Sequence, residues 1–558
     1  MAKRDTWSSE GLYFIPLGGS EQFGVNLNVY ACNGKLLAVD CGLGFADERH
    51  PGVDLLLPDP ALLEDNQDKL EGLIITHAHE DHIGAVAYLW ERLQCPIYCT
   101  PFTAAVLQEK LNDAGVKRAR PVIIKPKLSF STGTFNITPL PVSHSVPDTC
   151  ALLIETAHGR VLHSGDWNLD PEPVAGYKTD ESVFREAGKK GILAYVGDST
   201  NAQVPGRAGS ESLVEQGLAE EFKNCPGKIA VTVFSSNIGR VISIARAARD
   251  CGRTVCVVGR SLHRMISAAH YCGYMKDVPD FVNEEDMGYM PDDKVVLIVT
   301  GSQGEPRSAL AKIARGEHQS VKLRPRDTVI FSARAIPGNE KNINVVKNNL
   351  SGGDIKIITP DDTSSTIHVS GHPCRDEISD MFQWLRPNTV IPVHGEHTQL
   401  QAHAELARTC QVPNVIVPKN GSVIRLAPGT PFTVDHVETG LLAVEPKRII
   451  SSDHRAIAAR RKLQFSGTVH VTVILNGRGE LVAPPQAHTI GLVDEEEGDG
   501  KQFADNLHDE ILELIEEMSW EERTDDVFVK EELRIGMRRF VYHFLGIKPL
   551  VTIHLVRL

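Results

Sequence analysis

The sequence predicts a mixed α/β protein that is built from several domains. Its first part alternates short apolar runs with turn residues, its middle part alternates strand and helix patterns, and its C-terminal part is acidic and rich in helix formers. At 558 residues the chain is too long for one compact core. Two or three domains are therefore expected.

The first part, residues 8–208, predicts layers of short strands with polar residues gathered where the strands end. The expected strands are Gly11–Leu17, Leu27–Ala31, Lys35–Val39, Leu73–Thr76, Ile97–Cys99, Phe135–Pro139, Ala151–Glu155 and Arg160–His163. A helix is expected at Gly84–Leu93, where apolar residues recur at helical spacing.

The middle part, residues 209–365, predicts a second domain that interrupts the first. Its expected strands are Ile229–Phe234, Thr254–Val258, Val295–Val299 and Thr328–Phe331, with a helix at Ile238–Ala248 after the first of them. Strands that alternate with helices in this way indicate a parallel sheet covered by helices on both faces.

Residues 366–446 return to the style of the first part and are expected to complete the first domain, with Val390–Val393 as a short buried strand. A basic, helix-prone linker is expected at 447–464, followed by a small α+β domain at 465–558. In that domain a hairpin is expected to turn at Asn476-Gly477, and a strand at Leu550–Val556 closes the chain.

Composition places the chain among ordinary globular proteins, with 42% hydrophobic and 23% charged residues. We expect a cytoplasmic protein, because no stretch of 18 apolar residues and no signal-peptide core within Met1–Tyr13 is present.

The 11 cysteines are scattered, which favours reduced thiols. The net charge of -14 argues against a simple polyanion binder, although a local basic groove stays possible.

The run His77-Ala78-His79-Glu80-Asp81-His82 is the most informative stretch of the sequence. Three imidazoles and a carboxylate directly after an apolar strand suit Zn²⁺, and carboxylates also accept Mn²⁺ or Mg²⁺. Side chains two apart on an extended segment point the same way, so His77 and His79 can reach one metal. Asp81 and His82 lie past the bend and can reach a second.

Further ligands are expected where other strands end, because one segment cannot fill two coordination shells. Three residues follow expected strands in this way: His144, Asp166 and His394. Taken singly, each fits a structural role as well as a functional one. Taken together, they complete the pattern of a two-metal site.

The pattern His-x-His-x-Asp-His resembles the motif of the metallo-β-lactamase superfamily, whose fold is an αββα sandwich. The long insertion resembles that of the β-CASP branch, whose further motifs are matched by Asp198, His368 and His394. The overall plan is similar to that of the bacterial ribonuclease J family, including Pro16-Leu17-Gly18-Gly19, Phe234-Ser235-Ser236-Asn237 and a C-terminal domain.

The resemblance implies seven metal ligands. His77, His79 and His144 would hold one divalent metal, Asp81, His82 and His394 would hold the other, and Asp166 would bridge them. The implied catalytic residues are Asp81, His82, Asp166 and His368, with His368 at the scissile phosphate. The metals are expected to be two Zn²⁺, with Mn²⁺ or Mg²⁺ as alternatives.

Substrate contacts are implied for Ser235, Ser236, His368, Val369, Ser370, Gly371 and His372. Two imidazoles, a hydroxyl and backbone N–H groups beside a glycine can cradle a phosphate in the loop from His368 to His372. Ser235 and Ser236 precede a helix, so either a 5′ phosphate at the helix N-terminus or a simple N-cap explains them.

By resemblance the chain is expected to be a metal-dependent ribonuclease that acts in RNA processing and decay. Family members are 5′-to-3′ exonucleases that prefer a 5′ monophosphate and also cut internally. The C-terminal domain is expected to support a homodimer or homotetramer, and RNA-decay proteins are possible partners. Three alternatives stay open: a hydrolase of a small ester or thioester, a DNA-directed β-CASP nuclease, and an RNA-binding scaffold without catalysis.

Overall fold

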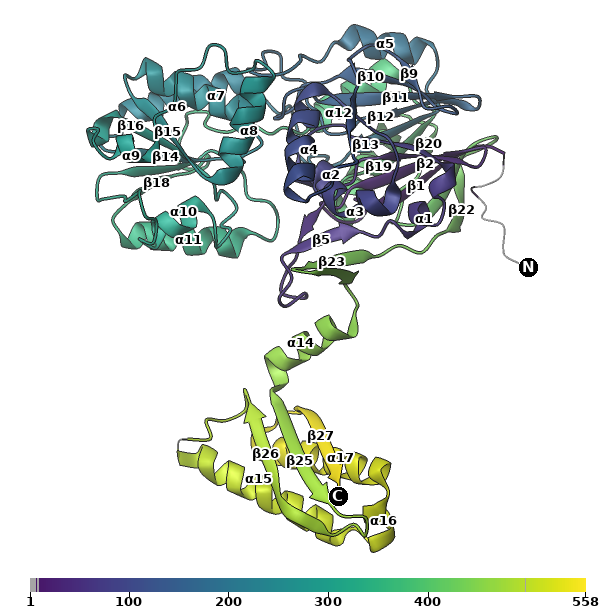
Figure 1. The fold of residues 1–558 in the computed structure, drawn as a ribbon. Helices are drawn as coiled ribbons and strands as arrows, with labels where there is room; N and C mark the ends of the chain where they lie inside the picture. Colours follow the sequence, from purple (N-terminus) through teal and green to yellow (C-terminus); the bar gives the residue numbers. More distant parts are fainter. Residues whose placement is uncertain (1–6, 8–9, 497) are drawn as a thin grey trace. The chain divides into compact units, whose positions relative to one another are not determined.

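The computed structural model describes residues 7, 10–496 and 498–558. Residues 8 and 9 of the expected first domain, and residues 1–6 of the opening stretch, lie outside the described residues. The described chain divides into two compact units (Figure 1). The larger unit contains the described residues up to Gly44 and Leu57–Leu441, and the smaller contains Phe45–Leu56 and Leu442–Leu558.

Two β-sheets pack face to face in the larger unit. The eight-stranded sheet contains β22 (Phe432–His436), β21 (Ser422–Ala427), β1 (Leu12–Gly18), β2 (Leu27–Cys32), β3 (Lys35–Val39), β6 (Leu70–Ile74), β7 (Ile97–Cys99) and β8 (Pro121–Ile123), in that order. The seven-stranded sheet contains β20 (Asn414–Val415), β19 (Thr389–Val393), β13 (Ala194–Asp198), β12 (Gly159–His163), β11 (Cys150–Thr156), β10 (Asn136–Pro141) and β9 (Phe130–Ser131). Phe14 and Tyr30 of the first sheet share one buried core with Leu152 and Val196 of the second.

Helices cover the outer faces of the two sheets. On the seven-stranded sheet lie α5 (Glu181–Lys189), α12 (Arg375–Leu385) and α13 (His397–Thr409), whose apolar faces share a core with strand residues such as Leu153 and Val390. The eight-stranded sheet is flanked by α1 (Ala61–Glu64), α2 (Glu80–Ile83), α3 (Val86–Leu93) and α4 (Pro101–Asp113), and α4 contacts β8. The predicted αββα sandwich is confirmed.

The inserted domain is built on a sheet of five parallel strands. Their order is β15 (Thr254–Val258), β16 (Val295–Val299), β14 (Ile229–Thr232), β17 (Thr328–Phe331) and β18 (Lys356–Ile358). One face packs on α6 (Glu211–Lys223), α7 (Ile238–Asp250) and α8 (Arg260–Tyr271), the other on α10 (Ala309–Ala314) and α11 (Glu340–Gly352), as Figure 1 shows. Burial on both faces explains why these strands are almost entirely apolar.

The chain returns from the inserted domain to complete both sheets of the sandwich. β19 adds to the seven-stranded sheet beside β13, in parallel, with Asp198 opposite Val393. β21 adds to the eight-stranded sheet beside β1. Because neighbouring parallel strands end at the same edge, residues some 200 positions apart in the chain come together there.

The smaller unit contains two further sheets. One is ordered β24 (Arg448–Ser451), β23 (Leu441–Glu445), β5 (Leu55–Pro58) and β4 (Gly44–Phe45), so residues 45–56 group with the C-terminal part, which the sequence did not predict. The other is ordered β26 (Leu481–Ile490), β25 (Thr468–Leu475) and β27 (Leu550–Arg557), with α15 (Gly498–Glu517) and α17 (Asp526–Leu545) packed on one face. The small α+β domain is confirmed.

Two local expectations for the smaller unit differ from the structure. The expected helix-prone linker at 447–464 contains most of α14 (Arg455–Ser466), but it begins with β24, which the sequence did not predict. The expected two-residue turn at Asn476-Gly477 is a five-residue loop, because Leu475 pairs with Leu481. The Asn476 side chain caps that loop by accepting from the backbone N–H of Arg478 and Glu480.

Candidate metal centre

The seven predicted metal ligands meet at one edge of the sandwich. His77 to His82 follow β6, His144 follows β10, Asp166 follows β12, and His394 follows β19. The backbone of His394 has a φ of 54°, a conformation that non-glycine residues rarely adopt, and its N–H donates to Gly19 O at 2.9 Å. Backbone strain of this kind is characteristic of functional sites.

One group of donor atoms is formed by His77, His79, His144 and Asp166. His79 Nδ1 lies 3.1 Å from His77 Nε2 and 3.2 Å from His144 Nε2. Asp166 Oδ2 lies 3.5 Å from His77 Nε2 and 3.8 Å from His144 Nε2. Four donor atoms therefore face one point.

A second group is formed by Asp81, His82, His394 and again Asp166. His82 Nε2 lies 3.5 Å from Asp81 Oδ2 and 3.3 Å from Asp166 Oδ2. His394 Nε2 lies 3.7 Å from Asp81 Oδ2 and 3.6 Å from Asp166 Oδ2. Because Asp166 belongs to both groups, it lies between them.

These spacings fit divalent metals. Ligand atoms about 2.0–2.1 Å from a tetrahedral zinc ion lie about 3.3–3.4 Å apart, which is the scale of the distances seen here. Both carboxylate oxygens of Asp166 are buried, and neither accepts a hydrogen bond from a described residue. A buried carboxylate without hydrogen bonds is costly unless a cation balances its charge. The donor set thus fits two bound cations.

The electrostatics of the site favour cation binding. Burial lowers the pKa of His144 to about 4 and, with the charge of His82 nearby, holds the pKa of His77 well below its usual range. These rings are therefore neutral at pH 7 and offer lone pairs. Burial opposes protonation of His82 too, but Asp166, Asp81 and Asp40 raise its pKa. The carboxylates that hold a proton there would equally stabilise a metal ion.

Polar residues outside the two donor groups orient the candidate ligands, because they contact the ring nitrogen that faces away from the donor groups. Asp40 Oδ2 lies 2.7 Å from His82 Nδ1, and the Thr76 backbone N–H donates to Asp40 Oδ1 at 2.8 Å. Asn26 Oδ1 lies 3.1 Å from His394 Nδ1. Such outer partners fix the tautomer and direction of ligating histidines. Sequence reasoning missed both residues, because each precedes the motif by many residues and stands alone.

His372 also lies at the centre. Its Nδ1 is 2.8 Å from Asp198 Oδ2 and 3.8 Å from Asp166 Oδ2, and these three residues form a further donor group with His394. Burial opposes protonation of His372, but the adjacent Asp198 carboxylate raises its pKa to about 9. Asp198 was singled out in the sequence, whereas its pairing with His372 was not.

His368 lies elsewhere. Its Nδ1 is 3.2 Å from Arg240 Nη1, and it belongs to none of the donor groups found among the described residues. Burial and the Arg240 charge lower the pKa of His368 to about 3. The role at the scissile phosphate that the sequence predicted for His368 stays a prediction, and His372 is the imidazole of this loop that reaches the donor groups.

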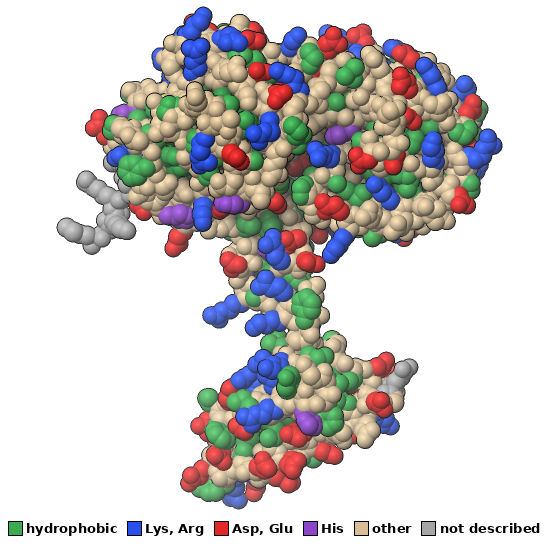
Figure 2. Space-filling view, turned by 180° about the vertical axis from the view of Figure 1, so that it is seen from behind, with side chains coloured by type: hydrophobic (Ala, Val, Ile, Leu, Met, Phe, Trp, Pro, Cys, Tyr) green, Lys and Arg blue, Asp and Glu red, His purple; other side chains and the backbone are tan. Residues whose placement is uncertain are grey.

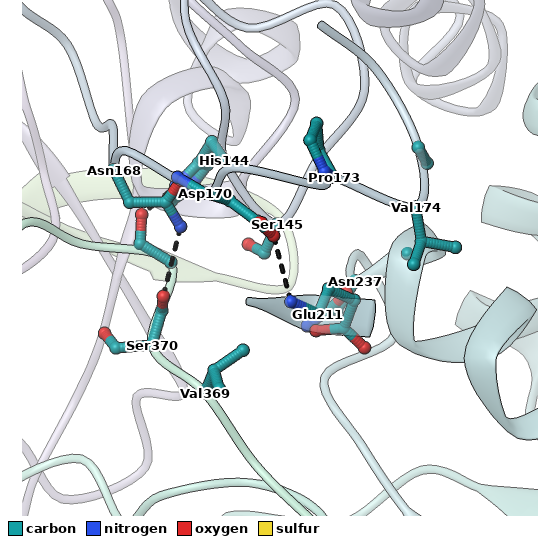
Figure 3. Close-up of a pocket in the computed structure, with 13 residues that line it drawn as sticks. His144, Ser145, Asn168, Asp170, Pro173, Val174, Glu211, Asn237, Val369 and Ser370 are labelled. Carbon is teal, nitrogen blue, oxygen red and sulfur yellow. Dashed lines mark hydrogen bonds between the residues drawn. The ribbon is translucent and has the colours of Figure 1, made fainter. Parts of the chain in front are cut away.

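A pocket opens beside the centre (Figure 3). Its walls come from the sandwich, the inserted domain and the returning chain: His144, Ser145, Asn168, Asp170, Pro173, Val174, Ala175, Glu211, Asn237, Gly239, Val369, Ser370 and Gly371. Asn168 Nδ2 donates to Ser370 O at 3.2 Å, and the Glu211 backbone N–H donates to Asp170 Oδ2 at 2.9 Å.

Ser235 and Ser236 lie between β14 and α7, as predicted, but neither lines this pocket. The N-cap of α7 is Asn237, whose side chain accepts from the Arg240 backbone N–H at 2.8 Å. Asn237 and Gly239 form the part of the pocket wall that comes from this helix. Substrate binding by the two serines stays a prediction.

On the face seen in Figure 2, the larger unit carries no extended region of one charge. Lys and Arg side chains are interspersed with Asp and Glu over the larger unit, and basic side chains gather over α14. The basic residues of α14 are Arg455, Arg460, Arg461 and Lys462. No helix in the described ranges is long and apolar enough to cross a membrane.

Four family models match successive parts of the chain. They are the β-lactamase superfamily domain at residues 37–184, the ribonuclease J β-CASP domain at 226–350, the Zn-dependent metallo-hydrolase RNA specificity domain at 364–418, and the ribonuclease J C-terminal domain at 455–558. The third match covers the loop from His368 to His372 and also His394.

The relatives are similar over most of their length. A ribonuclease J of Helicobacter pylori is 33% identical over 87% of this chain and 71% of its own length, and one of Mycolicibacterium smegmatis is 38% identical over 86% of each. A solved Enterococcus faecalis protein of unknown function shares the fold, with a TM-score of 0.53 at 16% identity over 74% of this chain and 100% of its own. A ribonuclease J of Sinorhizobium meliloti is 42% identical over 100% of this chain and 99% of its own length. At that identity and coverage, this chain belongs to the ribonuclease J family.

Proposed function

We propose that this protein is a metal-dependent ribonuclease that hydrolyses phosphodiester bonds of RNA. The observation that carries the proposal is the pair of donor groups joined by Asp166, which lies beside a pocket lined by Val369, Ser370 and Gly371. Relatives named ribonuclease J support RNA as the substrate, as does the match to an RNA specificity domain.

Two divalent cations would be held by the seven residues that the sequence singled out. His77, His79 and His144 would bind the first, Asp81, His82 and His394 the second, and Asp166 would contact both. Bound there, such cations supply a water of lowered pKa and stabilise the charge that develops in an in-line phosphoryl displacement. Zn²⁺ suits this mixed imidazole and carboxylate set best, and Mn²⁺ or Mg²⁺ are alternatives.

The loop from His368 to Gly371 would hold the substrate phosphate. Its carbonyl oxygens accept hydrogen bonds from side chains, including Asn168 Nδ2 on Ser370 O, while Asn201 Nδ2 donates to Ser370 Oγ at 2.8 Å. Carbonyls that are turned toward protein donors leave the loop amides free to face an anion. The Nδ1 of His372 lies 2.8 Å from Asp198 Oδ2, so the Nε2 of this ring faces away from Asp198. His372 would donate a proton or a hydrogen bond to the leaving oxygen.

The proposed activity has two modes. We propose 5′-to-3′ exonucleolysis with a preference for 5′-monophosphate ends, and additional internal cleavage. In the exonucleolytic mode the terminal phosphodiester bond would lie next to Asp166 and His372, whose Oδ2 and Nδ1 atoms are 3.8 Å apart. The C-terminal residues would support assembly of a dimer or tetramer.

Digestion of matched RNAs tests the proposal. RNAs that carry a 5′ monophosphate, triphosphate or hydroxyl are incubated with protein loaded with Zn²⁺ or Mn²⁺, and product lengths are followed in time. Release of mononucleotides is expected to be fastest from the monophosphate RNA and to stop with EDTA. A loaded protein that leaves all three RNAs intact contradicts the proposal, as does faster hydrolysis of small esters than of RNA.

A further inference from the structure

Arg240 is a fully buried arginine in the first turn of α7. Its Nε donates to Glu211 Oε1 at 2.6 Å and its Nη2 to Glu211 Oε2 at 2.9 Å, which is a two-point ion pair between α7 and α6. A buried charge of this kind is stable only when it is paired and hydrogen-bonded. Glu211 balances the charge and leaves the rest of the guanidinium for other contacts.

The remaining donors of Arg240 are directed at the loop that precedes His372. Nη1 donates to Ser332 O and Ser332 Oγ, both at 2.7 Å, and Ser332 Oγ donates in turn to Ile367 O at 2.6 Å. Nη2 donates to Val369 O at 3.4 Å. Arg240 thus anchors the loop on both sides of His368.

Arg240 also contacts His368 directly. His368 Nδ1 lies 3.2 Å from Arg240 Nη1, whose two hydrogens are directed at Ser332 O and Ser332 Oγ. The imidazole of His368 is therefore packed against the guanidinium that holds the loop.

The other end of the loop is anchored at the metal centre. Gly371 O lies 2.7 Å from His144 Nδ1, a bond that orients the Nε2 of His144 toward Asp166. Asn201 Nδ2 donates to His372 O at 3.2 Å. A displacement of the loop would therefore turn the imidazole of His144.

We propose that Arg240 is a positioning residue that couples the inserted domain to the metal centre through the loop from Ile367 to Gly371. By holding Ile367 and Val369 it sets the position of Gly371 O, and through that carbonyl the direction of His144. The role in phosphate binding rests on the proposed function, whereas the effect on His144 does not.

The test compares Arg240→Lys with the parent protein and with Arg246→Lys. Lysine keeps the charge that balances Glu211 but lacks the planar fork that spans Glu211, Ser332 and the loop. Arg246 lies on the same helix and pairs with Glu215 of α6 at 3.7 Å, so its variant controls for a weakened contact between these two helices. Zinc affinity of the metal-free protein is measured by competition with a chelator, and kcat and KM on RNA are measured at saturating metal.

Arg240→Lys is expected to bind one of two zinc ions about tenfold more weakly, the lower end of what loss of an outer partner of a ligand costs. Its kcat is expected to fall by about 10–100-fold with a smaller change in KM, while Arg246→Lys resembles the parent. A purely structural role would lower the melting temperature and leave zinc affinity and kcat unchanged. That result overturns the proposal.

Ser332→Ala keeps the inference testable if Arg240→Lys does not fold. It removes only the Ser332 hydroxyl that links Arg240 to Ile367 O, and a smaller change in the same direction is expected in zinc affinity and kcat. If Ser332→Ala then matches the parent in both, the proposal is wrong. If the parent itself does not cleave RNA, the proposed function fails, and the zinc affinities still decide the role of Arg240.

Discussion

The carboxylate of Asp40 lies 2.7 Å from Nδ1 of His82 and directs Nε2 of that ring toward Asp166, at 3.3 Å. Asp40 is itself fixed by the backbone and hydroxyl of Thr76, at 2.8 and 3.0 Å. A carboxylate, an imidazole and a cation in line are the usual arrangement of a ligating histidine and its outer partner. Asp40 therefore acts on the centre through His82.

Asp40→Asn is expected to weaken metal binding by about 10–100-fold without loss of the fold. The backbone of Asp40 has a φ of 62°, which asparagine also adopts, so the substitution changes mainly the charge that faces His82. Zinc affinity is measured by chelator competition. Asp65→Asn, at an exposed position just after α1, is the control, and equal affinities for the two variants contradict the assigned role.

Gly371→Ala is expected to reduce activity at least tenfold through His144, because outer partners of ligands have effects of about 10–100-fold. A Cβ at Gly371 would lie 2.8 Å from His144 Cε1 and 3.0 Å from Nδ1, which is too close unless the ring moves. Gly352→Ala is the matched control, since a Cβ there meets nothing within 4 Å. RNA cleavage and zinc affinity are compared for both, and a Gly371→Ala protein as active as Gly352→Ala would refute the contact.

Metal removal is expected to lower the melting temperature of the protein, because Asp166 is left as a buried carboxylate without hydrogen bonds from the described residues. A ligand that binds only the folded protein, at a free concentration of 100 times its Kd, adds about 2.7 kcal/mol to the free energy of unfolding. Differential scanning calorimetry with EDTA or with Zn²⁺ measures the change. The melting temperature of Asp166→Asn should differ little between EDTA and Zn²⁺. If zinc raises it as much as it raises the melting temperature of the parent, Asp166 does not contact both metals.

Tyr274→Phe is expected to reduce the free energy of unfolding by about 1.5–3 kcal/mol, the range for hydrogen bonds to charged groups. The Tyr274 hydroxyl donates to the buried carboxylate of Asp148, which also accepts from the Phe102 backbone N–H at 3.0 Å. The urea midpoint measures the loss. Tyr271 is 86% exposed at the end of α8, so Tyr271→Phe should leave the midpoint unchanged, and equal midpoints for both variants contradict the prediction.

A fragment that ends at Asp453 is expected to bind zinc like the full chain but to form smaller oligomers. All seven candidate metal ligands lie in the larger unit, and the last sheet and its helices have a core of their own. Ending after β24 keeps the pairing of β23 with β24. Light scattering after size-exclusion chromatography gives the mass of each, and an unchanged oligomer argues against assembly through the C-terminal residues.

Much of the fold and of the centre was predictable from sequence because the signals are local. Short apolar runs bounded by turn residues gave Lys35–Val39, Thr254–Val258 and Val295–Val299 with the bounds that the structure has. The ligand candidates could be found because each follows such a strand, and His77 to His82 is a cluster within six residues. These features depend on neighbouring residues in the chain.

The outer partners of the centre were decided by tertiary structure alone. Asp40 is separated from His82 by 42 positions, Asn26 from His394 by 368, and Gly371 from His144 by 227. A single aspartate, asparagine or glycine has no local pattern that reports such a contact.

The loop before His372 gives the sharpest example. It contains His368 and ends at His372, and the family resemblance implied a place at the scissile phosphate for His368. In the folded chain His368 lies 3.2 Å from Arg240 of the inserted domain, while His372 lies 2.8 Å from Asp198 at the centre. Which imidazole reaches the donor groups depends on charges placed nearby by other strands and helices, and that information exists only once the chain has folded.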